Sequence, residues 1–117
     1  MSVSDGYKAF VLDQLGGAGR ITAKAMFGGV GLYCQGLFFG LIDDDTLYLK
    51  VDDTTRPDME RVGSEPFRPY GDGSQVMQYY ALPADVLEDR EAARRWVERA
   101  IEVARRAART SGGRRRG

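Results

Sequence analysis

The chain has 117 residues, of which 43% are hydrophobic and 29% are charged, with a single cysteine and no histidine. These values are typical of one soluble globular domain in a reducing compartment, and they exclude intramolecular disulfides, catalytic triads, thiolate metal cages and most zinc sites. The formal net charge is zero, but six arginines lie in the last 13 residues. Residues 1–104, which we call the body, therefore hold 11 basic and 17 acidic residues and have a net charge of −6. This body should repel phosphate backbones.

The N-terminal segment predicts a helix. Ser4 is placed to cap it, and Asp5 lies in the first turn, where a carboxylate stabilises the helix dipole. Its apolar residues follow helical spacing up to Leu15, and the glycine-rich residues 16–19 end it.

Four strand segments follow, at residues 20–27, 30–34, 37–42 and 46–51. The first and the last alternate with a period of two, and the middle two are short apolar runs. The break at residues 35–36 ends in glycine and predicts a tight β-hairpin, and three consecutive aspartates make the next turn. In the fourth segment Leu47 and Leu49 should face the core, while Tyr48 and Lys50 should face the other way.

Residues 52–63 predict a short helix that Thr54 or Thr55 can cap, with Met59 and Val62 as its inward contacts. Residues 74–82 alternate loosely and should form the last strand.

A helical turn at residues 83–87 should precede a long amphipathic helix that begins at Arg90, with Asp89 as its N-cap. We expect this helix to end at Arg109 and to bury Trp96 in its apolar stripe.

This order of elements predicts an α+β fold with two layers, in which an antiparallel sheet of about five strands packs against the terminal helices. We expect a single domain over residues 1–109, followed by a disordered basic tail at residues 110–117.

Few residues suggest chemistry. The aspartates at 43–45 do not have the spacing of a calcium loop and are typical of a solvated turn. Gly28, Gly29 and Gly31 precede a strand rather than a helix, which favours a bulge over a phosphate-binding loop. Cys34 is expected to be a small packed side chain. We predict no metal and no cofactor. Lys50 is either a solvent-facing strand residue or, if it is desolvated, a nucleophile or base.

A series of motifs resembles the N-terminal domain of the TfoX (Sxy) family over about residues 5–105. The motifs occur in a fixed order, and each is weak alone. They are Met26-Phe27-Gly28-Gly29-Val30-Gly31-Leu32-Tyr33, Gly36, Leu47-Tyr48-Leu49-Lys50-Val51-Asp52, Arg56-Pro57, Gly63-Ser64-Glu65-Pro66-Phe67 and Tyr79-Tyr80-x-x-Pro83.

The resemblance implies a two-layer α/β fold and a role in bacterial regulation, since the best-known members promote natural competence by assisting transcription activation. Those members carry a second, C-terminal domain, whereas only a basic tail follows here, so we expect a stand-alone form. The resemblance supplies no catalytic residues. We expect a partner-binding surface formed by Met26, Phe27, Tyr33, Tyr48 and Lys50.

The leading hypothesis is therefore a non-enzymatic, cytoplasmic regulatory domain that contacts a protein partner, for which the transcription machinery is the natural setting. The alternative is nucleic-acid binding through the C-terminal arginines, which are Arg105, Arg106, Arg109, Arg114, Arg115 and Arg116. A third hypothesis is a small enzyme or ligand sink that uses Lys50, Tyr48 and nearby acidic residues. No membrane contact is expected, and a homodimer through a strand edge or a sheet face stays open.

Overall fold

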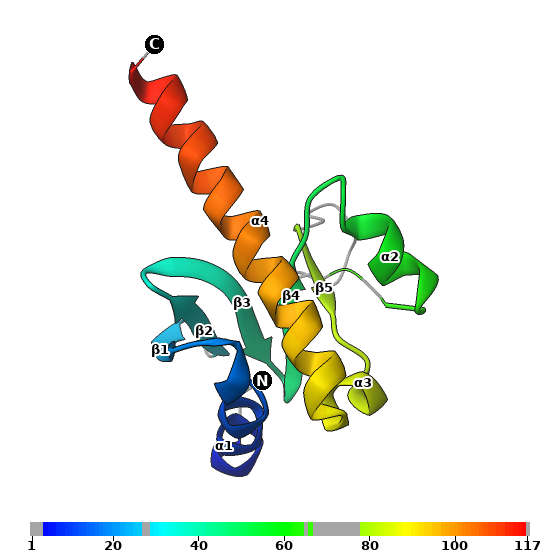
Figure 1. The fold of residues 1–117 in the computed structure, drawn as a ribbon. Helices are drawn as coiled ribbons and strands as arrows, with labels where there is room; N and C mark the ends of the chain where they lie inside the picture. Colours follow the sequence, from blue (N-terminus) through cyan, green and yellow to red (C-terminus); the bar gives the residue numbers. More distant parts are fainter. Residues whose placement is uncertain (1–3, 27–28, 65, 67–77, 117) are drawn as a thin grey trace.

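The computed structural model describes residues 4–26, 29–64, 66 and 78–116, without the side chains of Met26 and of residues 110–116. A five-stranded antiparallel sheet dominates this part of the chain. The strands lie in the order β1-β2-β3-β4-β5, so each pairs with its neighbour in sequence (Figure 1). This confirms the predicted α+β fold. The elements are α1 (Asp5–Gln14), η1 (Gly16–Ala18), β1 (Ile21–Met26), β2 (Gly29–Cys34), β3 (Leu37–Asp43), β4 (Thr46–Lys50), α2 (Arg56–Arg61), β5 (Tyr79–Ala81), α3 (Ala84–Glu88) and α4 (Arg90–Arg116).

Two tight turns hold β2, β3 and β4 together. Gln35 and Gly36 have φ angles of 54° and 79°, and Asp44 and Asp45 have φ angles of 51° and 52°. Positive φ at both turn positions matches the twist of the paired strands, and aspartate tolerates this conformation better than most residues. Asp45 also accepts hydrogen bonds from the backbone N–H and the hydroxyl of Ser4, at 2.8 and 3.1 Å, which ties the start of α1 to this turn.

A β-bulge in β3 decides which side chains enter the core. Leu32 pairs with Gly40 while the next residue, Tyr33, pairs with Phe38, so Phe39 is an extra residue on β3. Phe39 is completely buried, whereas Phe38 is only partly buried. Phe38 and Phe39 face opposite sides by the ordinary alternation of a strand. The bulge lets Phe39 and Ile42, which are three positions apart, both face the core.

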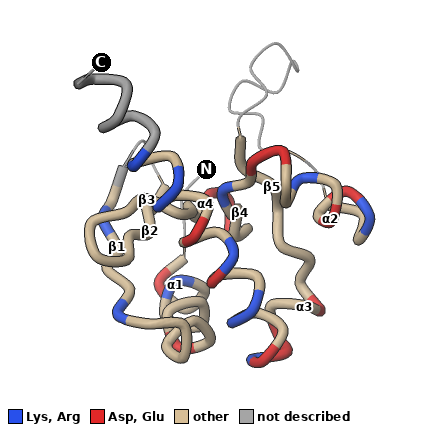
Figure 2. Tube along the Cα trace, turned by 45° about the horizontal axis from the view of Figure 1, so that its top comes forward, with Lys and Arg blue, Asp and Glu red and all other residues tan. Residues whose placement is uncertain are grey.

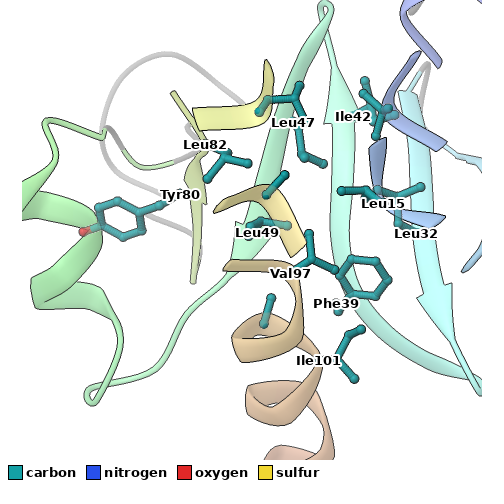
Figure 3. Close-up of a cluster of buried hydrophobic side chains, with 14 of the residues drawn as sticks. Leu15, Leu32, Phe39, Ile42, Leu47, Leu49, Tyr80, Leu82, Val97 and Ile101 are labelled. Atoms are coloured by element: carbon teal, nitrogen blue, oxygen red, sulfur yellow. The ribbon is translucent and has the colours of Figure 1, made fainter. Parts of the chain in front are cut away.

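The helical layer covers one face of the sheet. α4 crosses β3 and β4, with α1 and α3 beside its N-terminal half, and its C-terminal end projects past the sheet (Figure 1). Val97 and Ile101 of α4 lie beside Phe39 in the core (Figure 3). Burial of each large apolar side chain contributes about 1.5–3 kcal/mol, so this contact holds the two layers together.

The predicted helix starts are confirmed at both terminal helices. The Ser4 hydroxyl accepts from the Tyr7 N–H at 3.1 Å, and the Asp89 carboxylate accepts from the Ala92 N–H at 3.1 Å. At α2, Thr55 holds the N-cap position, but its hydroxyl accepts from the Asp52 N–H instead of capping the helix.

Some side-chain predictions were wrong. Val62 is 45% exposed because α2 ends at Arg61 and the chain then leaves the helical spacing that would have turned this residue inward. Trp96 packs against the core but is only partly buried, and the Arg99 guanidinium lies 4.9 Å from its ring centroid. α4 continues to Arg116 rather than ending at Arg109; the division into a domain and a basic tail stays a prediction.

Substitution of Gly40 tests the close packing of β3 against β4. A Cβ at this position would lie 2.7 Å from the Tyr48 carbonyl oxygen and 3.3 Å from a Leu49 methyl group. We therefore expect Gly40→Ala to lower the free energy of unfolding by about 1–3 kcal/mol, the usual cost of overpacking. Urea denaturation followed by circular dichroism measures it.

Gly6→Ala is the matched control, because a Cβ at Gly6 in α1 meets nothing within 4 Å. This change should leave stability unchanged or slightly raise it, since alanine favours a helix. Equal stability losses in the two variants would contradict the packing argument.

Candidate functional site

The face of the sheet opposite α4 carries most of the residues predicted to bind a partner. Successive strand residues point to opposite faces, so the positions between the core residues share this side. Three cross-strand pairs follow from the strand register: Tyr33 with Phe38, Leu41 with Tyr48, and Lys50 with Tyr79. We call this surface the aromatic face; it consists of Lys24, Tyr33, Phe38, Leu41, Tyr48, Lys50 and Tyr79.

Three rings form a row across the aromatic face. The Tyr33 and Phe38 centroids are 5.2 Å apart with a 38° angle between the ring planes, and the Phe38 and Tyr79 centroids are 5.6 Å apart with a 49° angle. Tilted pairs at these distances stabilise by about 0.5–1.5 kcal/mol each. Tyr33 and Phe38 are partly buried, and Tyr79 is only 6% exposed, so the row is a packed apolar strip.

A lysine lies over each end of this row. Lys24 Nζ is 5.4 Å from the centroid of Tyr33, and Lys50 Nζ is 5.1 Å from the centroid of Tyr79. The Lys50 ammonium also lies 3.4 Å from the Tyr79 hydroxyl oxygen. A cation over a ring face is stabilised by about 0.5–1 kcal/mol at exposed sites and by more where water is excluded.

Burial changes the acid–base behaviour of the pair at β4 and β5. Desolvation lowers the pKa of Lys50, because the charged ammonium loses water. Desolvation, with a smaller contribution from Tyr33, raises the pKa of Tyr79 to about 12. Tyr79 is therefore neutral at physiological pH, and Lys50 sits in a less hydrated site than a lysine on an open surface.

A groove adjoins the aromatic face at Tyr48. Its volume is about 390 Å³, and it lies between β4, β5 and the segment that follows α2. The Ser64 hydroxyl, at its wall, donates to the Ala81 carbonyl oxygen. The groove is lined by Thr46, Tyr48, Val62, Gly63, Ser64, Pro66, Ala81 and Pro83.

The predicted partner-binding residues are brought together in part. Tyr33, Tyr48 and Lys50 share the aromatic face, while the side chain of Met26 and the whole of Phe27 lie outside the described residues. The predicted partner-binding set did not include Lys24, Phe38 and Tyr79. A period-two pattern places each of them on one side of its own strand, but only the strand register and the bulge in β3 show that they are neighbours.

Comparison with known protein families shows that the family model of the TfoX N-terminal domain matches residues 13–104. The chain belongs to this family. Membership assigns it to a regulatory type of domain, in agreement with the resemblance seen in the sequence. No curated protein matches the chain.

In this TfoX N-terminal domain, the described arginines near the C-terminus already have acidic partners. Arg105, Arg106 and Arg109 lie 2.8, 3.8 and 3.6 Å from carboxylate oxygens of Glu102, and Arg106 also lies 2.7 Å from Asp52. Figure 2 shows blue and red segments interleaved along α4. Phosphate binding there would compete with these ion pairs. The side chains of Arg114, Arg115 and Arg116 lie outside the described residues, and nucleic-acid binding stays a prediction.

Two arginines of α4 also fasten α2 and the turn before it. Arg99 Nη2 lies 2.6 Å from an Asp58 carboxylate oxygen, and Arg106 binds Asp52, the residue that organises the turn before α2. Asp52 also accepts hydrogen bonds from the Thr54 N–H and hydroxyl at 3.0 and 2.6 Å. These pairs explain how a short helix beyond the sheet edge keeps its position against α4.

Metal binding and thiol chemistry have little support in the described part of the TfoX N-terminal domain. No group of three or more His, Cys, Asp or Glu side chains there could hold a metal ion. Cys34 is buried in the core, as predicted. Within the same described residues, no helix has the length and apolar character to cross a membrane.

Asp52 makes stability depend on pH. Burial disfavours its charged form, yet hydrogen bonds from Thr54 and Arg106 outweigh that effect and lower its pKa from 3.8 to about 2. A carboxyl whose pKa is lower in the folded state stabilises the fold above its unfolded pKa, and this contribution disappears as pH falls from about 4 to about 2. We expect wild type to be more stable than Asp52→Asn at pH 6, with the difference shrinking across that interval in urea titrations.

Asp53→Asn is the control for this experiment, because the Asp53 side chain is 95% exposed and its ion pair with Arg56 is a surface contact of little energy. It should change stability little at any pH. A stability difference for Asp52→Asn that stays constant down to pH 2 would contradict the role of its charge.

Proposed function

We propose that this domain is a non-enzymatic regulatory module that acts by contacting a protein partner through the aromatic face. One observation carries the proposal: three packed rings, two lysines and an adjoining groove lie together on the side of the sheet opposite α4. Aromatic side chains beside a groove are the anchors that protein interfaces favour.

Contact explains these residues better than catalysis does. The chain has no histidine to transfer protons near neutral pH. The side-chain hydroxyl within hydrogen-bonding reach of Lys50 belongs to Tyr79, and a phenol whose pKa is about 12 does not ionise enough at neutral pH to serve as a base. Lys50 therefore contacts only the neutral side chain of Tyr79 among the described contacts, which suits recognition better than proton transfer.

Family membership supports a regulatory setting for this contact. The partner that fits this setting best is a cytoplasmic protein of the bacterial transcription machinery. The net charge of −6 on residues 1–104 disfavours direct binding of the folded body to a long phosphate backbone and so also supports a protein partner.

Co-purification from native cell extract tests the proposal. We expect a specific protein to be retained by the wild-type chain and to be lost, by at least about tenfold, when Tyr33 and Tyr48 are both changed to alanine, as expected if the two rings are binding hot spots. Thermal unfolding of each variant confirms that the fold is intact.

Phe10→Ala is the matched control, because Phe10 is an aromatic residue of α1 that is 39% exposed and lies away from the aromatic face. It should retain the partner as wild type does. Retention of the same protein by the Tyr33 and Tyr48 double variant, or recovery of no specific protein by wild type, would contradict the proposal.

A further inference from the structure

Lysine is rare in this chain, and its placement is uneven. Only Lys8, Lys24 and Lys50 occur among the 17 basic residues, and the other 14 are arginines. Two of the three lysines lie on the aromatic face, one at each end of the ring row, while Lys8 lies on α1. The cations of this face are therefore all lysines, whereas those of α2 and α4 are all arginines.

The two kinds of cation also differ in their partners. Nine arginines of the described chain pair with carboxylates; they are Arg56, Arg61, Arg90, Arg94, Arg95, Arg99, Arg105, Arg106 and Arg109. Within the described residues, Lys24 and Lys50 have contacts to tyrosine rings and no carboxylate within ion-pair distance. The aromatic face thus holds two positive charges that no described acidic side chain neutralises.

The strand register places these charges at a defined separation. Lys24 in β1 pairs with Gly31, Gly31 with Leu41, and Leu41 with Tyr48, two residues before Lys50 in β4. Three strand spacings and two residues along a strand put the two lysine Cα atoms about 16 Å apart. Phe38 and Leu41 lie between them, so the face alternates cation, apolar strip and cation.

We infer that the aromatic face binds an acidic segment of a protein, whose carboxylates pair with Lys24 and Lys50 while its apolar side chains cover Phe38 and Leu41. This inference rests on the proposed function and adds the chemistry of the partner. It follows from charge complementarity: a carboxylate supplies the ion pair that each lysine lacks, and the rings supply apolar area between the two pairs.

A short acidic segment fits this face better than a nucleic acid does. Bases stack on free ring faces, whereas here each ring of the row is tilted against a neighbour, Tyr79 is almost fully buried, and the lysines lie over Tyr33 and Tyr79. A long phosphate chain would also extend over the acidic remainder of the body. At physiological salt, charges beyond about 8 Å are largely screened, so a short segment responds mainly to the two lysines.

The desolvation of Lys50 agrees with such a partner. Burial lowers the pKa of its ammonium in the free protein. A carboxylate at hydrogen-bonding distance would favour the charged form and raise that pKa again. Binding of an acidic segment and protonation of Lys50 should therefore support each other.

The three lysines make a direct test possible. Reductive dimethylation with ¹³C labels every lysine while keeping its charge, and Lys→Arg variants at positions 8, 24 and 50 assign the signals. The probe is a synthetic peptide that alternates Glu with Leu; a peptide with Gln at each Glu is its control. We expect the Glu peptide to shift the Lys24 and Lys50 signals and to raise the titration midpoint of Lys50, with Lys8 unmoved. The Gln peptide should shift none of them.

The second readout is the affinity of the protein for the Glu peptide, which carries a fluorescent dye and is followed by fluorescence anisotropy. Lys24→Gln with Lys50→Gln should weaken binding at least about tenfold, as should a rise in salt. Lys8→Gln with Arg95→Gln removes the same charge from α1 and α4 and should change affinity less than about twofold. Equal losses in the two double variants would overturn the inference.

Three further outcomes would also overturn it. A single-stranded oligothymidylate that shifts Lys24 and Lys50 at lower concentrations than the peptide would assign the face to nucleic acid. Shifts that follow the concentration of the protein alone, with self-association in the ultracentrifuge, would assign it to a second copy. In the extract experiment, a partner lost by the Tyr33 and Tyr48 variant but kept by the double Lys→Gln variant at all salt concentrations would preserve the proposed function and refute the acidic partner.

Discussion

One extra residue in β3 determines which side chains of this strand face the core and which face the opposite side of the sheet. The bulge at Phe39 lets Leu32 pair with Gly40 and Tyr33 pair with Phe38, so that Phe39 and Ile42 enter the core while Phe38 and Leu41 line the aromatic face. Side chains alternate strictly along a regular strand, where residues three positions apart face opposite sides. The bulge is what lets Phe39 and Ile42 share the core side, and it also lets Phe38 and Leu41 share the aromatic face. The contact of Phe39 with Val97 and Ile101 of α4, and the row of Tyr33, Phe38 and Tyr79, both depend on this one local irregularity.

Charge is distributed differently over the two layers. On the helical side, arginines and carboxylates pair with one another, and some of the pairs fasten α2 and the turn before it to α4. These are structural contacts: Arg105, Arg106 and Arg109 share the carboxylate of Glu102, and Arg106 also pairs with Asp52. On the aromatic face the cations are lysines held over rings. The face therefore combines apolar area with positive charge, and this composition is the basis of the acidic, partly apolar partner that we propose.

Two independent observations support the proposed function: membership in the TfoX N-terminal domain family and the geometry of the sheet. The family is regulatory in type, and under the proposed function regulation depends on a surface that another molecule recognises. The aromatic face and the groove beside Tyr48 provide such a surface on rigid strands, whose register is fixed by two tight turns and the bulge. Rigid strands keep the entropy cost of ordering a binding surface low.

The sequence alone determined the order of elements, the antiparallel meander, the caps at Ser4 and Asp89, and the opposite orientations of Leu49 and Lys50, because these follow from spacing, hydrogen-bonding side chains and short links between strands. It also carried the family resemblance. Only the tertiary structure decided that Lys24, Phe38 and Tyr79 join Tyr33 and Lys50 on one face, because residues far apart in the chain meet through strand register, which local pattern does not encode. The same holds for the partners of Arg99 and Arg106. The sequence predicted an amphipathic helix, but the carboxylates that pair with these two arginines come from residues 52–58, a segment placed by the fold as a whole.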